Sequence, residues 1–282
     1  MKKIFFIFVC LFVCNAQAGL IGLASGSPGK LFSIDETTGA ATVIVSVDAI
    51  CVGYAGATFL NGSLYGSGIC DLNTYTTSAI GTIDISTGDY SFVNDMDGSS
   101  GWHGLATDEN AGLIYAIDIF DGNTLKSMTS TGLVTSIGSG AGIDGRGMAY
   151  DDFNDILYAA DLGGGLYTVD TLLGTSTFIG NMGISTTTIG LAFDETTGVL
   201  YANEGANLYS VDTVSGLATL IGRNDFSDTD ISGIDGLAWL DTTPSEMDSV
   251  PAPASSALLG LGLVAIGFFR KTGEGKFFTK IK

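Results

Sequence analysis

The chain has 282 residues, of which 30 are Asp or Glu, 11 are Lys or Arg and one is His, so its formal net charge is −19. Glycine supplies 41 residues, about twice its usual share, but follows no triplet, which excludes a collagen-like chain. The acidic balance argues against nucleic acid as a partner, because a phosphate backbone is held by clustered Lys and Arg.

Residues 1–18 have the order of a secretory signal peptide. A basic start, Met-Lys-Lys, is followed by an apolar run over residues 4–13 and by the small-residue sequence Ala16-Gln17-Ala18. We therefore expect cleavage after Ala18 and export of the protein by a bacterium.

Residues 19–242 contain one motif five times. Its clearest copy is Gly-Leu-Ala-Phe-Asp-Glu-Thr-Thr-Gly-Val-Leu-Tyr-Ala at 190–202, and its first half recurs at 56–60, 104–108, 147–151 and 236–240. Each copy contains four short β-rich runs, and the copies follow one another at intervals of 43 to 48 residues. This period and strand number are typical of propeller blades. The sequence therefore predicts an all-β fold, a five-bladed β-propeller of four-stranded blades.

The turns between these strands have their own signature. Asp is followed four residues later by Gly at 35/39, 84/88, 108/112, 170/174, 194/198 and 212/216. Such an Asp caps a type I turn with its side chain, and the Gly adopts the left-handed conformation that closes a hairpin. Two hairpins per blade are therefore predicted.

The two ends of the repeat region complete each other. Residues 20–24 are similar to a second strand, and residues 236–240 are similar to a first strand without its successors. We expect the last strand to pair with the N-terminal blade, because this closes the ring and leaves no long unpaired edge. The motifs resemble the Leu-Tyr-x-Ile-Asp-x-x-Thr-Gly propeller repeats of bacterial surface proteins and lack the Trp-Asp signature of WD repeats.

If the first strand of each blade lines the channel, the Asp-to-Gly hairpins lie on one face and the variable loops on the other. Those loops run over 66–79, 95–103, 138–146, 181–189 and 224–235. On a repeat scaffold such loops usually carry the function.

Two cysteines remain after removal of the signal peptide. Cys51 and Cys70 both fall on the variable face, and disulfides persist in exported proteins. We predict a disulfide between them that stabilises the fold by about 3 kcal/mol on the chain-entropy model. Two free thiols are the alternative.

One acidic loop is similar to the start of a calcium loop. It contains Asp228, Asp230, Ser232 and Asp235, which alternate as oxygen ligands of a hard cation would. Trp239 stands where an EF-hand has its bidentate Glu, so a solvated acidic loop is the alternative to a bound calcium cofactor.

Three residues before first strands are candidates for contact with a ligand: Trp102, His103 and Arg146. His103 and Arg146 each directly precede a repeat glycine and could meet at the mouth of the channel. A single His cannot build a multi-histidine metal site, and an ordinary loop contact is the alternative for each residue. No catalytic residue is assigned.

Glycoside hydrolases also occur among five-bladed propellers, and they need paired carboxylates in a central cleft. We attribute Glu36, Glu109 and Glu195, which directly follow turn aspartates, to solvation. The remaining carboxylates at the channel are then Glu204, Asp118 and Asp161.

The C-terminal region consists of a linker, residues 243–253, and a hydrophobic segment with a basic tail, residues 254–282. Val250-Pro251-Ala252-Pro253, a Gly-Leu-rich run and then Arg270-Lys271 resemble the PEP-CTERM sorting tail of Gram-negative bacteria, with Ala252 where that family usually has Glu. The resemblance implies transient anchoring in the inner membrane, processing by an exosortase, and delivery to the cell surface or an exopolysaccharide matrix. An ordinary C-terminal anchor is the alternative.

Without its two ends the chain is more acidic. Residues 19–250 contain 4 basic and 29 acidic residues, a net charge of −25, which repels anionic surfaces and favours divalent cations. We predict an exported propeller that binds exopolysaccharide or another surface component. The alternative is a carbohydrate-active or metal-dependent enzyme that acts on extracellular glycans.

Overall fold

The computed structural model describes residues 19–26, 28–47, 53–69, 78–95, 101–184, 189–224, 231 and 233–241. Contacts divide the chain into two units, residues 1–242 and residues 243–282, and all described residues belong to the first. The predicted signal peptide, cysteine pair and sorting tail lie outside the described residues. Regular structure in the described part consists of strands alone, so no helix there has the length and hydropathy of a membrane span.

Twenty strands form five antiparallel four-stranded sheets, each of which is a blade. The first blade contains β20 (Gly236–Leu240), β1 (Gly19–Ala24), β2 (Gly29–Ile34) and β3 (Ala41–Val47). The second contains β4 (Gly53–Leu60), β5 (Ser63–Ile69), β6 (Ser78–Ile83) and β7 (Tyr90–Asp95). The third contains β8 (Trp102–Asp108), β9 (Leu113–Asp118), β10 (Thr124–Thr129) and β11 (Val134–Ile137). The fourth contains β12 (Gly145–Asp151), β13 (Ile156–Asp161), β14 (Gly165–Val169) and β15 (Ser176–Asn181). The fifth contains β16 (Ile189–Asp194), β17 (Val199–Glu204), β18 (Asn207–Val211) and β19 (Ala218–Arg223).

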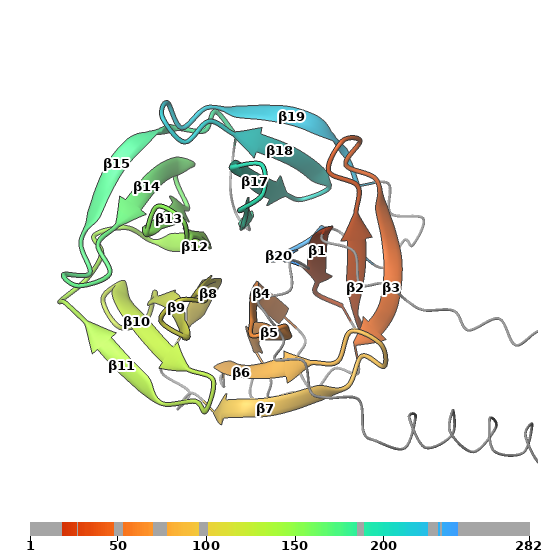
Figure 1. The fold of residues 1–282 in the computed structure, drawn as a ribbon, viewed down its shortest axis with the longest axis horizontal. Coiled ribbons are helices and arrows are strands. Elements are labelled where there is room, and N and C mark those ends of the chain that lie inside the picture. Colours follow the sequence, from red (N-terminus) through yellow and green to blue (C-terminus); the bar gives the residue numbers. More distant parts are fainter. Residues whose placement is uncertain are drawn as a thin grey trace, which may run out of the picture. The chain divides into compact units, whose positions relative to one another are not determined.

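The blades are arranged around a central axis (Figure 1). Strands β4, β8, β12, β16 and β20 lie innermost, and β3, β7, β11, β15 and β19 lie outermost. The chain is therefore a five-bladed β-propeller, as its repeats predict.

The first blade is built from both ends of the propeller sequence. Strand β20 pairs antiparallel with β1, with Leu20 opposite Trp239 and Gly22 opposite Leu237. Strand β1 then pairs with β2, where Gly22 lies opposite Phe32. The predicted joining of head and tail is confirmed. Because this unit closes on itself, it has the features of a self-contained domain.

The Asp-to-Gly turns form as predicted. The Gly39 N–H donates to the Asp35 carbonyl oxygen at 2.8 Å, while Asp35 Oδ1 accepts the N–H groups of Thr37 and Thr38 at 2.9 Å. Gly39 has φ +74°, a left-handed conformation that glycine adopts without strain. The glycine donates to the aspartate carbonyl in the same way at 84/88, 108/112, 170/174, 194/198 and 212/216.

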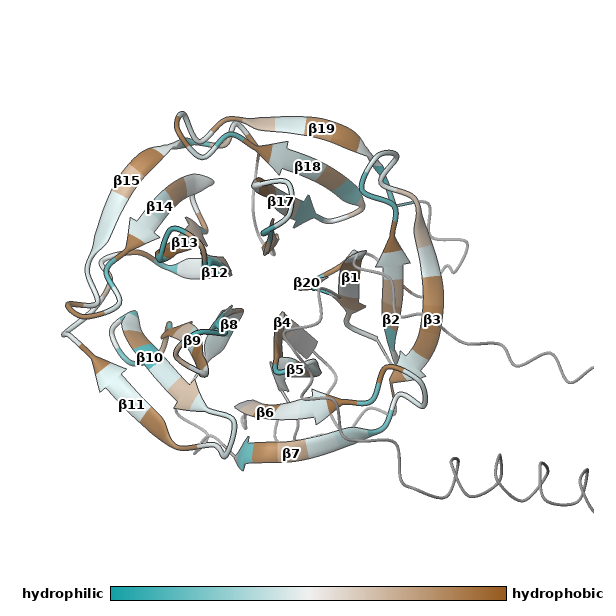
Figure 2. Ribbon diagram, viewed as in Figure 1, coloured by the Kyte–Doolittle hydropathy of each residue, from teal (hydrophilic) through white to brown (hydrophobic). Residues whose placement is uncertain are grey.

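Hydrophobic side chains form five clusters, one between each pair of neighbouring blades. Leu23 and Leu31 of the first blade, for example, pack against Phe59 and Leu64 of the second. Figure 2 accordingly shows hydrophobic segments in every blade. Since each blade is one sheet with two apolar faces, it can bury them only against its neighbours. The ring therefore stabilises all of its blades together.

Aromatic rings stack across three of these interfaces. Tyr201 lies 6.1 Å from Trp239, with the two ring planes 8° apart. Equivalent stacks join Tyr115 to Tyr150 and Tyr158 to Phe193. In each pair the tyrosine comes from a second strand and its partner from the first strand of the next blade. This explains the repeated Leu-Tyr-Ala and the aromatic residue near the end of the first-strand motif.

The motif glycine lets the innermost strands approach one another. A Cβ atom added to Gly56 would lie 2.8 Å from the carbonyl carbon of Gly104, which is closer than real Cβ contacts come. Added to Gly104, it would lie 2.8 Å from the backbone nitrogen of Met148. Motif glycines 147, 190 and 236 are crowded in the same way by the next blade. The repeat therefore requires glycine here because backbone packs on backbone around the channel.

Candidate functional site

The fivefold repeat places equivalent residues at the two ends of the channel. The residues just before the motif glycines, at the starts of the innermost strands, form the mouth ring: Ala55, His103, Arg146, Ile189 and Asp235. The residues just after the innermost strands, at the end that carries the first hairpin turns, form the carboxylate ring: Asn61, Glu109, Asp152, Glu195 and Asp241. These two rings hold most of the polar candidates.

His103 and Arg146 meet in the mouth ring. Arg146 Nη1 lies 3.3 Å from His103 Nδ1, although the residues belong to different blades, on β8 and β12. Asp144 holds the other side of the guanidinium. Its Oδ2 accepts a hydrogen bond from Arg146 Nη2 at 2.9 Å. Its Oδ1 lies 2.9 Å from Nε, within ion-pair distance but not aligned as a hydrogen bond. We call these three side chains the mouth cluster.

A β-bulge turns Arg146 away from its own sheet. In the pairing of β12 with β13, Gly145 lies opposite Asp161 and Gly147 opposite Ala160, so Arg146 has no partner. Bulges of this kind redirect a side chain and are common beside functional sites. The backbone N–H of Leu162 also donates to the Asp144 carbonyl oxygen at 3.0 Å. Both members of the ion pair are therefore fixed by the backbone of the fourth blade.

The electrostatics of the mouth cluster follow from its burial. Burial, and next the positive charge of Arg146, lower the pKa of His103 to about 4, against the opposing effect of Asp144. The imidazole is therefore neutral at neutral pH. Because an arginine has only donors, Nδ1 of His103 accepts from it, and the imidazole proton is on Nε2. The cluster thus combines one ion pair with a neutral histidine.

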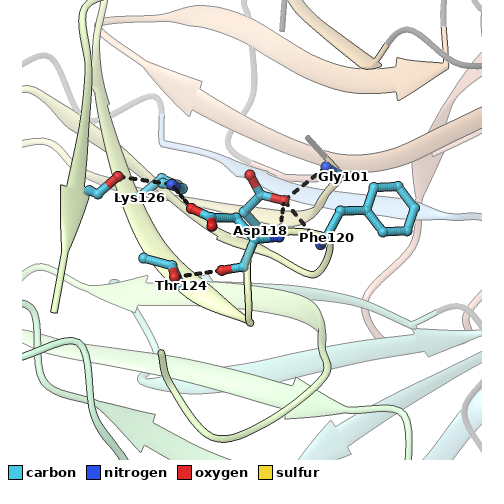
Figure 3. A network of polar contacts seen from close by, with 7 residues as sticks. Gly101, Asp118, Phe120, Thr124 and Lys126 are labelled. Carbon is cyan, nitrogen blue, oxygen red and sulfur yellow. Dashed lines mark hydrogen bonds and ion pairs between the residues drawn. The ribbon is translucent and has the colours of Figure 1, made fainter. Parts of the chain in front are cut away.

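The segment before His103 is anchored by Asp118, whose side chain is 1% exposed. Figure 3 shows Asp118 Oδ1 accepting the N–H groups of Gly101 at 3.0 Å and Phe120 at 3.1 Å. In the same view Lys126 Nζ lies 2.5 Å from Asp121 Oδ2 and donates to Ser136. Asp118 was a candidate catalytic carboxylate, and its Oδ1 atom holds the loop between β9 and β10.

Asp161, the second aspartate considered for catalysis, also has local partners. Its Oδ1 accepts the Gly165 N–H at 2.7 Å, and its Oδ2 accepts the Tyr167 hydroxyl at 3.1 Å. Asp161 therefore shapes the turn between β13 and β14.

Trp102 does not belong to the mouth cluster. Its side chain is 3% exposed and packs with Leu60 and Ile114 in the core between the second and third blades. The interpretation of Trp102 as a ligand-contacting residue is corrected, because strand β8 begins at this residue and directs its ring into the interface.

The carboxylate ring links successive blades at the other end of the channel. The N–H of Asn61 donates to both carboxylate oxygens of Glu109 at 2.9 and 3.1 Å. The N–H of Glu109 in turn donates to Asp152 Oδ1 at 2.9 Å, and that of Asp152 to Glu195 Oε1 at 2.7 Å. Glu109 is exposed, as solvation implies, but it and Glu195 also join neighbouring blades through these hydrogen bonds. Their equivalence in all copies of the repeat was the signal that could have revealed this ring.

Three members of the carboxylate ring have raised pKa values. Burial, with smaller contributions from the charges of Glu195 and Asp108, raises the pKa of Asp152 to about 7, although backbone hydrogen bonds lower it. Burial likewise raises the pKa values of Glu109 and Glu195, and the charge of Asp241 adds to both shifts. Burial first, and neighbouring negative charges second, therefore disfavour ionised carboxylates at this end of the channel.

Most of the predicted calcium loop, including Asp228, Asp230 and Ser232, lies outside the described residues. Asp235 is described, and its Oδ2 accepts the Ser25 N–H at 2.8 Å. Burial raises the pKa of Asp235, which opposes its ionisation as a ligand. Within the described ranges, no three His, Cys, Asp or Glu side chains are placed to hold a metal ion.

The fold of this chain resembles that of solved proteins. It aligns with a chain in the crystal structure of a nidogen/laminin complex, at a TM-score of 0.57 and 13% identity, over 80% of this chain and 99% of that one. The chain is a β-propeller by comparison as well as by topology. A structural genomics protein of unknown function from Bacteroides thetaiotaomicron VPI-5482 aligns with a TM-score of 0.44 and 14% identity, over 72% of this chain and 50% of that one. No protein-family model and no curated protein matches the sequence.

Proposed function

We propose that this protein is an exported propeller that binds a component of the cell surface or of an exopolysaccharide matrix. The proposal rests on one observation: the polar side chains at both ends of the channel are held by hydrogen bonds to other protein groups. In the mouth cluster, Asp144, Arg146 and His103 contact one another. In the carboxylate ring, Glu109, Asp152 and Glu195 accept backbone N–H groups from the preceding blade. These groups build a rigid surface.

Binding is favoured over catalysis because of the state of these groups. A general base needs a pKa near the working pH and a lone pair directed at the substrate. His103 has a pKa of about 4, and its free lone pair faces Arg146. Asp118 and Asp161 are committed to loops. The mouth cluster, Asp118 and Asp161 thus support a recognition role better than acid–base chemistry, while Asp152, whose pKa is about 7, uses Oδ1 to accept the Glu109 N–H.

Location is proposed from the sequence at the two ends of the chain. The signal-peptide pattern of residues 1–18 supports export. The resemblance of residues 250–271 to a PEP-CTERM tail supports transient residence in the inner membrane and processing by an exosortase. The solved chain that this propeller resembles belongs to a nidogen/laminin complex, and a binding role is proposed here for the same fold.

The test is a glycan array probed with the purified unit of residues 19–242, with hydrolysis of the same glycans followed in parallel. Retention on particular glycans without cleavage supports the proposal. Cleavage of a retained glycan would instead establish the enzymatic alternative. Absence of retention from surface polysaccharides of the producing bacterium, as well as from the array, would contradict a role in binding glycans.

A further inference from the structure

The mouth cluster offers hydrogen-bond donors and acceptors side by side. An arginine carries five N–H groups. His103 takes one N–H of Nη1 and Asp144 one N–H of Nη2, so among the described residues each terminal nitrogen keeps one further N–H. The Nε–H lies within ion-pair distance of Asp144 but is buried. His103 adds its Nε2–H, and Asp144 Oδ2, which accepts one hydrogen bond from Arg146, keeps further accepting capacity, whereas Oδ1 is buried. The Asp144 and Arg146 side chains are 36% and 17% exposed, so solvent reaches both.

The cluster carries no net charge, although residues 19–250 have a net charge of −25. The charges of Asp144 and Arg146 compensate each other, and His103 is neutral at neutral pH. An anionic ligand would be repelled by the acidic body. A simple cation would be repelled by the positive charge of Arg146. It would bind more favourably to the many carboxylates that have no arginine beside them. A neutral ligand meets neither obstacle.

A hydroxyl group both donates and accepts a hydrogen bond. Two adjacent hydroxyls can therefore accept from the Arg146 and His103 N–H groups and donate to Asp144. From this match we propose that the mouth cluster is a binding site for a neutral saccharide, contacted through neighbouring hydroxyl groups. The inference rests on the proposed binding function and adds the place and the ligand class.

The site is arranged before a ligand arrives. Arg146 occupies the bulge of β12, and Leu162 fixes the backbone of Asp144. Asp118 anchors Gly101, two residues before His103. Groups that are already ordered lose little freedom on binding, which favours affinity from a small number of contacts.

The chain contains a single histidine, so histidine labelled with nitrogen-15 gives one imidazole in NMR spectra of the 19–242 unit. We would titrate this protein with neutral methyl glycosides of glucose, galactose and mannose, and with glucuronate and galacturonate at the same ionic strength. At least one neutral glycoside should shift the His103 resonances saturably. The uronate of the same sugar should bind at least about tenfold more weakly.

Variants locate the binding. Arg146→Gln should weaken binding of the active glycoside about tenfold or more, since hydrogen bonds from charged groups are lost. Arg223→Gln makes the same charge change at the exposed end of β19 and should leave the affinity unchanged. Asp144→Asn serves as a second variant at the mouth if Arg146→Gln does not fold, and circular dichroism checks each fold.

The outcomes separate this inference from the proposed function. If the glycans retained on the array bind Arg146→Gln as tightly as the wild type, the protein binds glycans but not at the mouth cluster. If a uronate binds as well as its neutral counterpart, the assigned ligand class is wrong. If no neutral glycoside shifts His103 and the array retains nothing, the site and the proposed glycan binding are both contradicted.

Discussion

Gly39 in the first blade lies directly against Gly222 in the last, so the ring is joined at its rim as well as beside the channel. A Cβ atom added to Gly39 would lie 2.9 Å from the carbonyl carbon of Gly222, and one added to Gly222 would overlap the carbonyl oxygen of Thr38. The same turn of every other blade packs on the outer part of the preceding blade, through Gly88, Gly132, Gly174 and Gly216. Hairpin turns that are specified by short local motifs therefore also hold neighbouring blades together.

Gly39 and Gly198 provide a matched pair for testing this contact. Both end an Asp-to-Gly turn with positive φ, +74° and +71°, but a Cβ atom on Gly198 would meet nothing within 4 Å. Gly198→Ala should lower the free energy of unfolding by about 1 kcal/mol through backbone strain alone. Gly39→Ala should lower it by about 1 to 3 kcal/mol more, because it also crowds the neighbouring blade. Urea unfolding measures both values, and equal losses would show that the rim contact contributes nothing.

The carboxylate ring should make stability depend on pH. The pKa of Asp152 is about 7 in the folded protein and near 4 in the unfolded chain. Between these values the folded state binds more protons, so this contribution to the free energy of unfolding rises as the pH falls from 7 to 4. His103 acts in the opposite direction, because its folded pKa of about 4 is below its unfolded value near 6.5. Its contribution is lost as the pH falls through the same window.

The difference in free energy of unfolding between Asp152→Asn and wild type reports on Asp152 alone, because His103 contributes equally in both proteins. The amide oxygen can still accept the Glu109 N–H, but the charge is gone. At pH 8 the variant should be more stable by about 1 kcal/mol, a modest figure because solvent screens the half-buried carboxyl. Near pH 4 the two proteins should be equally stable. Asn61→Asp adds a carboxylate at the remaining ring position and should have the reverse effect at pH 8. A stability difference between Asp152→Asn and wild type that does not vary with pH would refute the raised pKa of Asp152.

The mouth cluster predicts a specific shift in the titration of the single histidine. Removing the positive charge in Arg146→Gln should raise the pKa of His103 from about 4, because Arg146 lowers it and Asp144 raises it. The value should stay below 6.5, since burial is the larger cause. Arg223→Gln should leave the titration unchanged. The measurement is an NMR titration of the imidazole, and an unchanged pKa in Arg146→Gln would contradict their electrostatic contact.

The architecture was largely predictable because each copy of the repeat specifies its own strands and turns through short local motifs. The spacing of the Gly-Leu-Ala motifs predicts the blade number, and the incomplete copy around Trp239 predicts the pairing of β20 with β1. The approach of His103 to Arg146 was also foreseeable, since both directly precede a motif glycine in neighbouring blades.

What sequence reasoning missed depends on contacts between blades. Glu109 and Glu195 follow turn aspartates and so look like solvated turn residues, yet each accepts an N–H from a residue more than 40 positions away. Trp102 has a glycine before it and a histidine after it, as a loop residue would, but it starts β8 and enters a core. Asp144 was not singled out because its role depends on the bulge at Arg146.

Hydrogen exchange of the 19–242 unit, read by mass spectrometry, tests most directly whether head and tail lock a single cooperative ring. We expect peptides covering residues 19–24 and 236–240 to exchange as slowly as those from β9 and β13, because all of them should open only in global unfolding. Rapid exchange of residues 236–240, with protection kept in the other blades, would show that the ring is not closed by β20.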